Sequence, residues 1–229
     1  MIALSSETVK EYGLGAGASV VGIAASKDFF LAPDGFKPTD ILGDCLSVIV
    51  LGVPSPKEAL TMDPPDYTAL RNEKLTEMTD IAKKVAKRIK ADGYQSKAIS
   101  ASGGKTVEID GRKEHFGYIS LKHAAEIAGL GVIGKNYLLT SLRYGNLLWL
   151  SAVLTDAPLT PDDRVAQSIC EGCNQCVEAC PAGALDDIPP FGKKGCSQYF
   201  RIENKKFLIK CYQCRAVCPK RFGVVEGAG

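Results

Sequence analysis

Eight of the nine cysteines of this 229-residue chain fall in its last 60 residues. The first four are spaced Cys170-x2-Cys173-x2-Cys176-x3-Cys180, and Pro181 follows them. Three thiolates at this spacing on a curling loop wrap one cube of four irons and four sulfides, and the fourth thiolate points away to a neighbouring cluster. The proline stops the backbone from continuing as a strand and donates no N–H. The spacing therefore predicts ligation of [4Fe–4S] clusters.

A second cysteine run is incomplete. Reading back from Cys218, the spacing of the first run recurs at Cys214 and Cys211, but the next expected position holds Leu208. Cys196, fifteen residues before Cys211, is the remaining cysteine in this part of the chain. We therefore predict two clusters, as in bacterial ferredoxins. Cluster I takes Cys170, Cys173, Cys176 and Cys218. Cluster II takes Cys180, Cys196, Cys211 and Cys214.

Structural zinc and disulfide bonds are the competing interpretations of these cysteines. Zinc modules hold cysteines in pairs that lie farther apart in the sequence than this run. The N-terminus shows no export signal and no twin arginine, which predicts a cytoplasmic protein, where thiols stay reduced. No apolar run approaches the ~20 residues of a membrane span. Cys45 precedes an apolar run and is expected to be a packed thiol.

The segment from 193 to 221 is basic. An oxidised cluster with four thiolates carries a net charge of about −2, so nearby cations are expected. Three interpretations of this basic segment remain open. It compensates the cluster charge and docks an acidic electron donor, it binds the phosphates of RNA, or it is a solvated face without a partner. The basic residues are Lys193, Lys194, Arg201, Lys205, Lys206, Lys210, Arg215, Lys220 and Arg221, against Glu203 alone.

The chain ahead of the cysteines predicts an α/β or α+β core. Apolar runs of strand length, typical of a sheet covered on both faces, occupy 19–25, 47–53 and 146–155, with a weaker strand at 94–100. Helical periodicity covers 67–91 and 120–130, with Ser120 as an N-cap, and a weaker helix covers 5–16. Residues 103–114 are expected to form a loop. We expect residues 1–160 to form the core and 161–229 the cluster domain, joined near 156–163.

One segment matches two phosphate-binding motifs superficially. Gly129 to Asn136 contains G-x-G-x-x-G and nearly matches G-x-x-x-x-G-K-[ST]. Both motifs need a strand before them and a helix after them, whereas a helix is predicted before this one. Asn136 also has no hydroxyl to bind Mg²⁺. The glycines are better explained by a turn or by close approach to a flat or bulky group.

At this segment the sequence resembles the epoxyqueuosine reductases and the related reductive dehalogenases, which are cobalamin-dependent iron–sulfur enzymes. The matching stretches are 37–54 (KPTDILGDCLSVIVLGVP), 120–145 (SLKHAAEIAGLGVIGKNYLLTSLRYG), 150–159 (LSAVLTDAPL) and the cysteine segment. Cys196 followed by CxxCxxxCP also fits the second-cluster pattern of that family. The resemblance covers most of the chain.

The resemblance implies a core related to nitroreductase and cobalamin-processing folds, followed by a ferredoxin-like domain with two [4Fe–4S] clusters. It implies that cobalamin is held base-off near cluster I, with electrons passing from cluster II to cluster I to cobalt. A low-potential donor, ferredoxin or flavodoxin, is the expected partner. Candidate neighbours of the corrin or substrate are Gly131, Gly134, Lys135, Asn136, Arg143 and Tyr144.

The sequence departs from the family in two ways. The aspartate that serves as proton donor in epoxyqueuosine reductases has no counterpart, and the matching place lies near His115, so His115 or Tyr118 is the candidate donor. The chain also stops soon after the second run, without a helical-repeat extension, so tRNA is the less expected substrate. The alternatives are an activator that reduces a corrinoid or metal centre of a partner protein, and a core that binds flavin.

Overall fold

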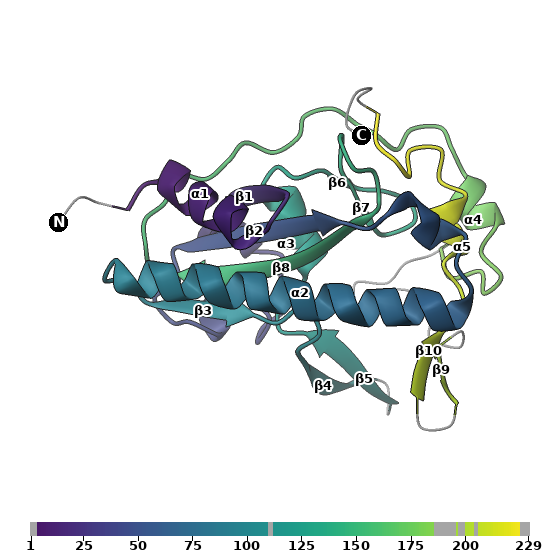
Figure 1. Ribbon diagram of the computed structural model, residues 1–229, viewed down its shortest axis with the longest axis horizontal. Coiled ribbons are helices and arrows are strands. Elements are labelled where there is room, and N and C mark those ends of the chain that lie inside the picture. Colours follow the sequence, from purple (N-terminus) through teal and green to yellow (C-terminus); the bar gives the residue numbers. More distant parts are fainter. Residues whose placement is uncertain (1–3, 110–111, 186–195, 197–199, 204–205, 225–229) are drawn as a thin grey trace. The chain divides into compact units, whose positions relative to one another are not determined.

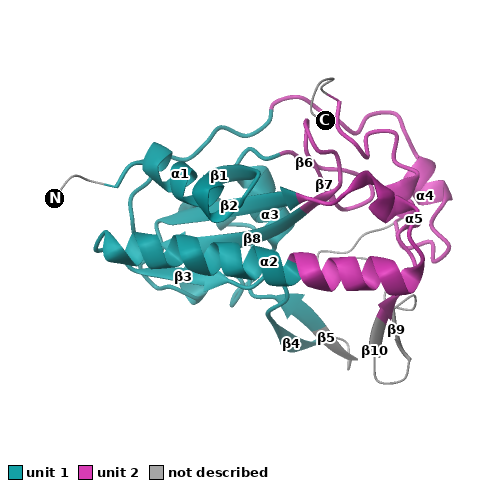
Figure 2. Ribbon diagram, viewed as in Figure 1, with its two compact units in different colours: residues 1–53, 75–130, 149–165 teal, residues 54–74, 131–148, 166–229 magenta. Residues whose placement is uncertain are grey.

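The computed structural model describes residues 4–109, 112–185, 196, 200–203 and 206–224 (Figure 1). The chain folds into two compact units (Figure 2). Unit 1 contains residues 1–53, 75–130 and 149–165, and unit 2 contains residues 54–74, 131–148 and 166–229. The division of the chain into domains at residue 160 stays a prediction.

A four-stranded sheet forms the centre of unit 1, and its strands lie in the order β1-β2-β8-β3. The strands are β1 (Val20–Ala25), β2 (Ser47–Pro54), β8 (Leu148–Thr155) and β3 (Ser96–Ile99). Strands β1 and β2 are antiparallel, with Ile23 opposite Ile49, and β3 and β8 are antiparallel as well. Each predicted strand is present, with bounds that differ from the prediction by at most two residues at either end. The mixed α/β core is thereby confirmed.

Three helices accompany the sheet: α1 (Ser6–Ala16), α2 (Pro64–Ala91) and α3 (Leu121–Ile127). The Ser5 hydroxyl caps α1 by accepting a hydrogen bond from the Thr8 N–H. Ser120 stands at the N-cap position of α3, but its hydroxyl pairs with His123 Nδ1 at 2.6 Å instead of capping the backbone. Among the described residues, no helix is long and apolar enough to cross a membrane.

Both faces of the sheet are covered. On one face, α1 and α2 share a core with the strands, which includes Val9, Ile23, Ile49, Leu51, Met78, Val85 and Val153. Neighbouring strand residues point to opposite faces, and the backbone at Gly22, next to Ile23, lies close to the carbonyl of Ala128 after α3. The first seven residues of β2 are all buried, as a sheet covered on both faces requires.

The prediction of a loop at residues 103–114 is wrong. These residues form most of a hairpin of β4 (Gly104–Ile109) and β5 (Arg112–Gly117), paired antiparallel with Thr106 opposite His115. The overlooked signals are the alternating Thr106-Val107-Glu108-Ile109 pattern and the Asp110-Gly111 dipeptide, a common hairpin-turn sequence. Lys105 Nζ lies 3.8 Å from the centre of the Phe36 ring, and Phe36 packs edge-on against Phe116. These contacts hold the hairpin against the loop between β1 and β2.

The segment predicted to join the two domains is tied into unit 1. Asp162 accepts hydrogen bonds from the Ile23 N–H and from Lys10 Nζ, the latter at 2.5 Å. Farther back, the Ser47 hydroxyl donates to the Ala157 carbonyl at 2.7 Å. The change from unit 1 to unit 2 falls between residues 165 and 166.

Unit 2 is built from short elements around the cysteines. Its strands pair as two hairpins, β6 with β7 and β9 with β10. The bounds are β6 (Val132–Ile133), β7 (Leu139–Thr140), α4 (Gln175–Glu178), β9 (Phe200–Glu203), β10 (Lys206–Ile209) and α5 (Gln213–Ala216). Short 3-10 turns at Ser26–Phe29 and Pro38–Asp40 in unit 1 and at Lys57–Leu60 in unit 2 complete the fold.

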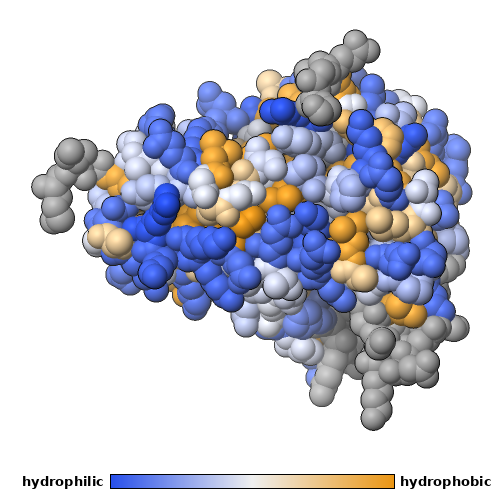
Figure 3. Space-filling model, in the orientation of Figure 1, coloured by the Kyte–Doolittle hydropathy of each residue, from blue (hydrophilic) through white to orange (hydrophobic). Residues whose placement is uncertain are grey.

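We expect Met78→Ala to lower the free energy of unfolding by about 2–5 kcal/mol, because Met78 is fully buried between α2 and the sheet. Urea unfolding followed by circular dichroism measures the change. The surface over the C-terminal half of α2 is largely hydrophilic (Figure 3). Lys87, an exposed residue of α2, is the control. Lys87→Ala should change the free energy by less than about 0.5 kcal/mol. Equal effects of the two changes would contradict the assigned core.

Candidate metal centre

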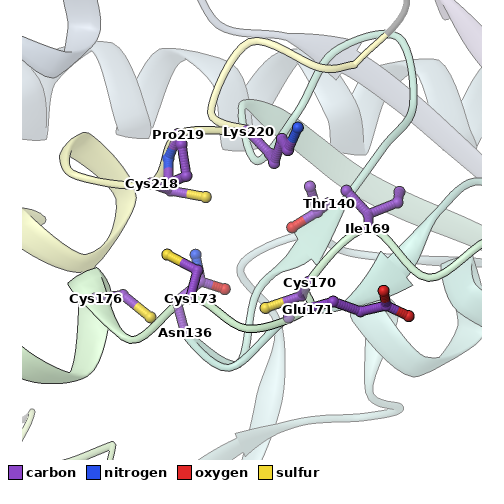
Figure 4. A pocket seen from close by; sticks show the side chains of 11 residues that line it. Asn136, Thr140, Ile169, Cys170, Glu171, Cys173, Cys176, Cys218, Pro219 and Lys220 are labelled. Atoms are coloured by element: carbon purple, nitrogen blue, oxygen red, sulfur yellow. The ribbon is translucent and has the colours of Figure 1, made fainter.

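Four cysteines surround one cavity in unit 2 (Figure 4). They are the set predicted for cluster I: Cys170, Cys173, Cys176 and Cys218. The cavity encloses about 470 Å³, part of it open to solvent. The rest of its wall comes from Gly134, Asn136, Thr140, Ile169, Glu171, Pro219 and Lys220. Two cysteine runs that are far apart in the sequence thus meet at one place, together with the β6–β7 hairpin.

Short helices position the cysteines of the two runs. Cys176 lies on α4 and Cys214 lies on α5, and the two helices pack against each other (Figure 1). Cys218 follows α5, and its carbonyl accepts a hydrogen bond from the Arg221 N–H at 3.0 Å. The Arg221 carbonyl in turn accepts from the Asn146 N–H at 3.2 Å. The turn that contains Cys218 is therefore fixed to the segment that follows β7.

The β6–β7 hairpin holds both cysteine runs through two adjacent residues. The Lys135 N–H donates to Cys170 Sγ at 3.3 Å, and Lys135 Nζ donates to Asn174 Oδ1 at 2.6 Å, both in the first run. Asn136 Nδ2 donates to the Cys214 carbonyl at 3.3 Å, in the second run. Asn136 is only 2% exposed. This dipeptide was predicted to lie near a corrin or substrate, a role that stays a prediction; in the structure these three hydrogen bonds that it donates go to the cysteine loops.

The cavity fits an iron–sulfur cluster by its donors. Thiolates are the ligands that such clusters take, and backbone N–H groups aimed at cysteine sulfurs are their usual supporting contacts. Burial raises the pKa of the Cys176 thiol, and the nearby Cys170, Cys214 and Cys218 raise it further. Burial also raises the pKa of Cys218. Cluster assembly must therefore displace protons from these thiols.

The cysteines stand apart around the cavity. Within the described parts of the chain, no group of three or more His, Cys, Asp or Glu side chains is close enough to hold a single metal ion. The four sulfurs lie along the wall of the cavity instead (Figure 4).

The second set of ligands stays a prediction, because residues 186–195 and 197–199 on either side of Cys196 lie outside the described residues. The Cys180 sulfur accepts a hydrogen bond from the Ala184 N–H at 3.3 Å. The long spacing between Cys196 and Cys211 does have an explanation in the fold. The β9–β10 hairpin lies between these two cysteines, and Leu208 is part of strand β10, opposite Arg201. Position 208 thus belongs to a strand and not to a cysteine loop.

The other predicted site residues fall in both units. His115 on β5 and Tyr118 just after it are exposed residues of unit 1. In unit 2, Gly131 is buried before β6, and Arg143 is exposed with its guanidinium 5.2 Å from the centre of the Tyr144 ring. The roles assigned to these residues stay predictions.

Sequence reasoning missed two contributors to the site. Asn146 is 1% exposed, and its Nδ2 donates to the Arg215 carbonyl at 3.2 Å. Tyr212 stacks on Tyr67 at the start of α2, with ring centres 4.4 Å apart. The sequence signal for Asn146 was a polar residue at the start of an apolar run. Tyr212 lies between two predicted ligands, Cys211 and Cys214, but the sequence does not indicate its contact with Tyr67, which is 145 residues away.

A family profile described as a 4Fe-4S dicluster domain matches residues 169–222. These residues form a 4Fe-4S dicluster domain. The predicted class of cofactor is thus confirmed, and it accounts for the cavity lined by four cysteines.

Relatives of similar sequence are epoxyqueuosine reductases. The chain is 36% identical over 119 residues to the epoxyqueuosine reductase of Listeria monocytogenes, a match that covers 47% of this chain and 31% of that protein. It is 38% identical over 104 residues to the Synechococcus enzyme, which covers 42% of this chain and 32% of the relative. The match spans about a third of the length of these curated relatives. The resemblance found in the sequence is confirmed.

Solved structures show the same fold. An epoxyqueuosine reductase bound to a tRNA stem loop aligns over 94% of this chain and 64% of its own, with a TM-score of 0.63 and 20% identity. A catabolic reductive dehalogenase aligns over 94% of this chain and 32% of its own, with a TM-score of 0.73 and 19% identity. At such identities the likeness establishes the fold, namely an α/β core with a ferredoxin-like domain.

We expect Tyr212→Ala to speed the loss of iron from one cluster to a chelator several-fold. Tyr212 anchors the loop between Cys211 and Cys214 by stacking on Tyr67 and by donating its hydroxyl to the Met62 carbonyl. A buried aromatic pair contributes about 0.5–1.5 kcal/mol beyond its area. The control is Tyr212→Phe, which keeps the stacking and should lose iron more slowly than Tyr212→Ala. Equal rates in the two variants would contradict an anchoring role of the ring.

Proposed function

We propose that this chain is an iron–sulfur oxidoreductase that passes single electrons through two [4Fe–4S] clusters to an acceptor held by the same chain. The observation that carries the proposal is the cavity in which Cys170, Cys173, Cys176 and Cys218 meet the β6–β7 hairpin. That hairpin follows α3 directly and lies in residues 120–145, one of the stretches that resemble the epoxyqueuosine reductases and reductive dehalogenases. When bound, such clusters supply one-electron transfer at low potential.

The chain's own residues hold and tune this site. Four thiolates bind the cluster, and the Lys135 N–H donates to the Cys170 sulfur. Lys220 lines the cavity, so its ammonium offsets part of the cluster's negative charge. Lys210 and Lys220 are exposed, and we propose that this basic segment docks an acidic donor of the ferredoxin or flavodoxin class.

We propose cobalamin as the acceptor, on the strength of the resemblance and of the fold shared with reductive dehalogenases, one of which is described as B12-dependent. Anaerobic protein loaded with iron and sulfide should shift the visible spectrum of added cobalamin to the base-off form. Released flavin in the purified protein would favour the alternative acceptor. Loaded protein that leaves the cobalamin spectrum unchanged would overturn the cobalamin proposal and favour an activator that reduces a partner's corrinoid or metal centre.

Reduction of epoxyqueuosine in tRNA is the second candidate, favoured by the names of the relatives. One solved neighbour was crystallised with an epoxyqueuosine-modified tRNA stem loop. Cluster-loaded protein with cobalamin and a chemical reductant should convert such a stem loop to the queuosine form. A loaded, reducible protein that leaves the stem loop unchanged would exclude this substrate.

A further inference from the structure

The Thr140 side chain brings a buried hydroxyl to the cavity of the four cysteines. Thr140 lines that cavity and is only 3% exposed. Figure 4 shows its oxygen directed toward the space between the cysteine sulfurs. Within the described part of the chain, this hydroxyl has no hydrogen-bond partner. Because buried polar groups are normally hydrogen-bonded, we expect the acceptor of the hydroxyl to lie in the cavity.

Gly134 leaves open the space beside this hydroxyl. A Cβ on Gly134 would lie 3.4 Å from Thr140 Oγ1 and 3.6 Å from Cys170 Sγ. The hydroxyl and the sulfur therefore border the same space, which a larger residue at position 134 would fill. The Lys135 N–H already donates to Cys170 Sγ at 3.3 Å. This corner of the cavity thus has a backbone donor on the cysteine and a hydroxyl next to it.

The β6–β7 hairpin fixes the direction of the Thr140 hydroxyl. Thr140 lies on β7, opposite Val132 of β6. The next residue, Ser141, exchanges two backbone hydrogen bonds with Gly145, at 2.7 and 3.0 Å. A β-branched side chain also has a restricted χ1 angle. The hairpin, and not a cysteine loop, therefore sets where the hydroxyl points.

Sulfurs are the main acceptors that this cavity offers to the hydroxyl. Four cysteines line it, and a bound [4Fe–4S] cluster adds sulfides of its own. Asn136 Oδ1 also lies beside Gly134, but it already accepts the Leu138 N–H at 3.1 Å. Hydrogen bonds to cluster sulfurs stabilise the reduced state more than the oxidised state, because the reduced state is more negative. They therefore raise the reduction potential.

We propose that the Thr140 hydroxyl donates a hydrogen bond to a sulfur of cluster I and thereby raises the reduction potential of that cluster. The inference rests on the proposed function and adds a direction to it. A cluster I of raised potential draws electrons from cluster II. The cluster that meets the β6–β7 hairpin is then the one that stays reduced.

The test is a redox titration of the loaded protein, followed by electron paramagnetic resonance. The cluster I signal is the one that disappears in Cys173→Ser. Thr140→Val keeps the shape and the β-branch of the side chain and removes the hydroxyl. We expect its equilibrium for reduction of cluster I to fall about fivefold, which lowers the midpoint by about 40 mV for one electron. The cluster II midpoint should stay unchanged. Unchanged midpoints of both clusters would overturn the inference.

Two controls separate the hydroxyl from other effects of the substitution. Thr140→Ser keeps a hydroxyl, so its cluster I midpoint should lie closer to that of the wild-type protein than the midpoint of Thr140→Val does. Thr61 is an exposed threonine of unit 2 and is not among the residues that line the cavity. Thr61→Val should leave both midpoints unchanged. A shift in Thr140→Ser equal to that in Thr140→Val would contradict the role of the hydroxyl.

Loss of the cluster in a variant is also informative. If Thr140→Val does not bind cluster I, the midpoint of Thr140→Ala decides by the same criterion. Retention of cluster I by Thr140→Ser, with loss from both Thr140→Val and Thr140→Ala, would support the contact with the hydroxyl. Loss from all three variants would overturn it. Wild-type protein that assembles no clusters would instead defeat the proposed function.

Discussion

Cys173→Ser should bind about half the iron of the wild-type chain after anaerobic loading, about four irons instead of about eight. Cys173 lines the cavity together with three other cysteines. A serine hydroxyl is a poor substitute for a thiolate ligand, so one corner of cluster I is lost. Cluster II takes none of its predicted ligands from this position and should remain. Iron and sulfide analysis of the purified variant measures the effect.

Cys45→Ala is the matched control for this change. Cys45 is 3% exposed, and its thiol donates weakly to the Ser47 carbonyl at 3.5 Å in unit 1. Burial raises its pKa, so it stays a neutral thiol. This variant should keep all of its iron. Full iron content in Cys173→Ser would contradict the assignment of cluster I, and so would half the iron in Cys45→Ala.

Gly145→Ala is expected to abolish cluster I without touching a ligand. Gly145 adopts φ +57, and a Cβ there would lie 2.1 Å from the Arg221 carbonyl oxygen. The left-handed backbone costs a residue with a Cβ about 1–2 kcal/mol. The clash adds about 1–3 kcal/mol, because the backbone must move. The displaced turn contains Cys218, so iron should fall to about four per chain.

Gly172→Ala tests whether cluster I is lost because of the clash with the neighbouring backbone or because of the left-handed backbone conformation. Gly172 adopts φ +62, but a Cβ there would meet no atom within 4 Å. This variant should lose about 1–2 kcal/mol of stability and keep both clusters. If Gly145→Ala and Gly172→Ala retain the same amount of iron, the packing of Gly145 on the Cys218 turn does not position the ligand.

The cysteine runs, the sheet and the long helix were predictable because each has a local signal. Periodicity marks α2, and unbroken apolar runs mark β2 and β8. The β4–β5 hairpin was missed because charged residues and glycines masked the alternation of its apolar and polar residues. Packing on Phe36 helps to stabilise this hairpin. A contribution from tertiary contact of this kind leaves only a weak trace in the sequence.

The residues that position the cysteine ligands could not be predicted in the same way. Lys135 and Asn136 were selected for their place in a glycine motif, whereas in the structure each donates a hydrogen bond to one of the two cysteine runs. Asn146 had no motif at all, because its role depends on contact with Arg215 and with the turn after it. Ligand types and spacings are local properties, but the residues that orient ligands are brought in by the fold.

The most direct test is Mössbauer spectroscopy of the chain loaded anaerobically with ⁵⁷Fe and sulfide, combined with metal analysis. Two clusters predict about eight irons and eight sulfides per chain, with all of the iron in the [4Fe–4S] form. A protein that holds tetrahedral zinc without sulfide, or only about four irons per chain, would contradict the assignment of eight cysteines to two clusters.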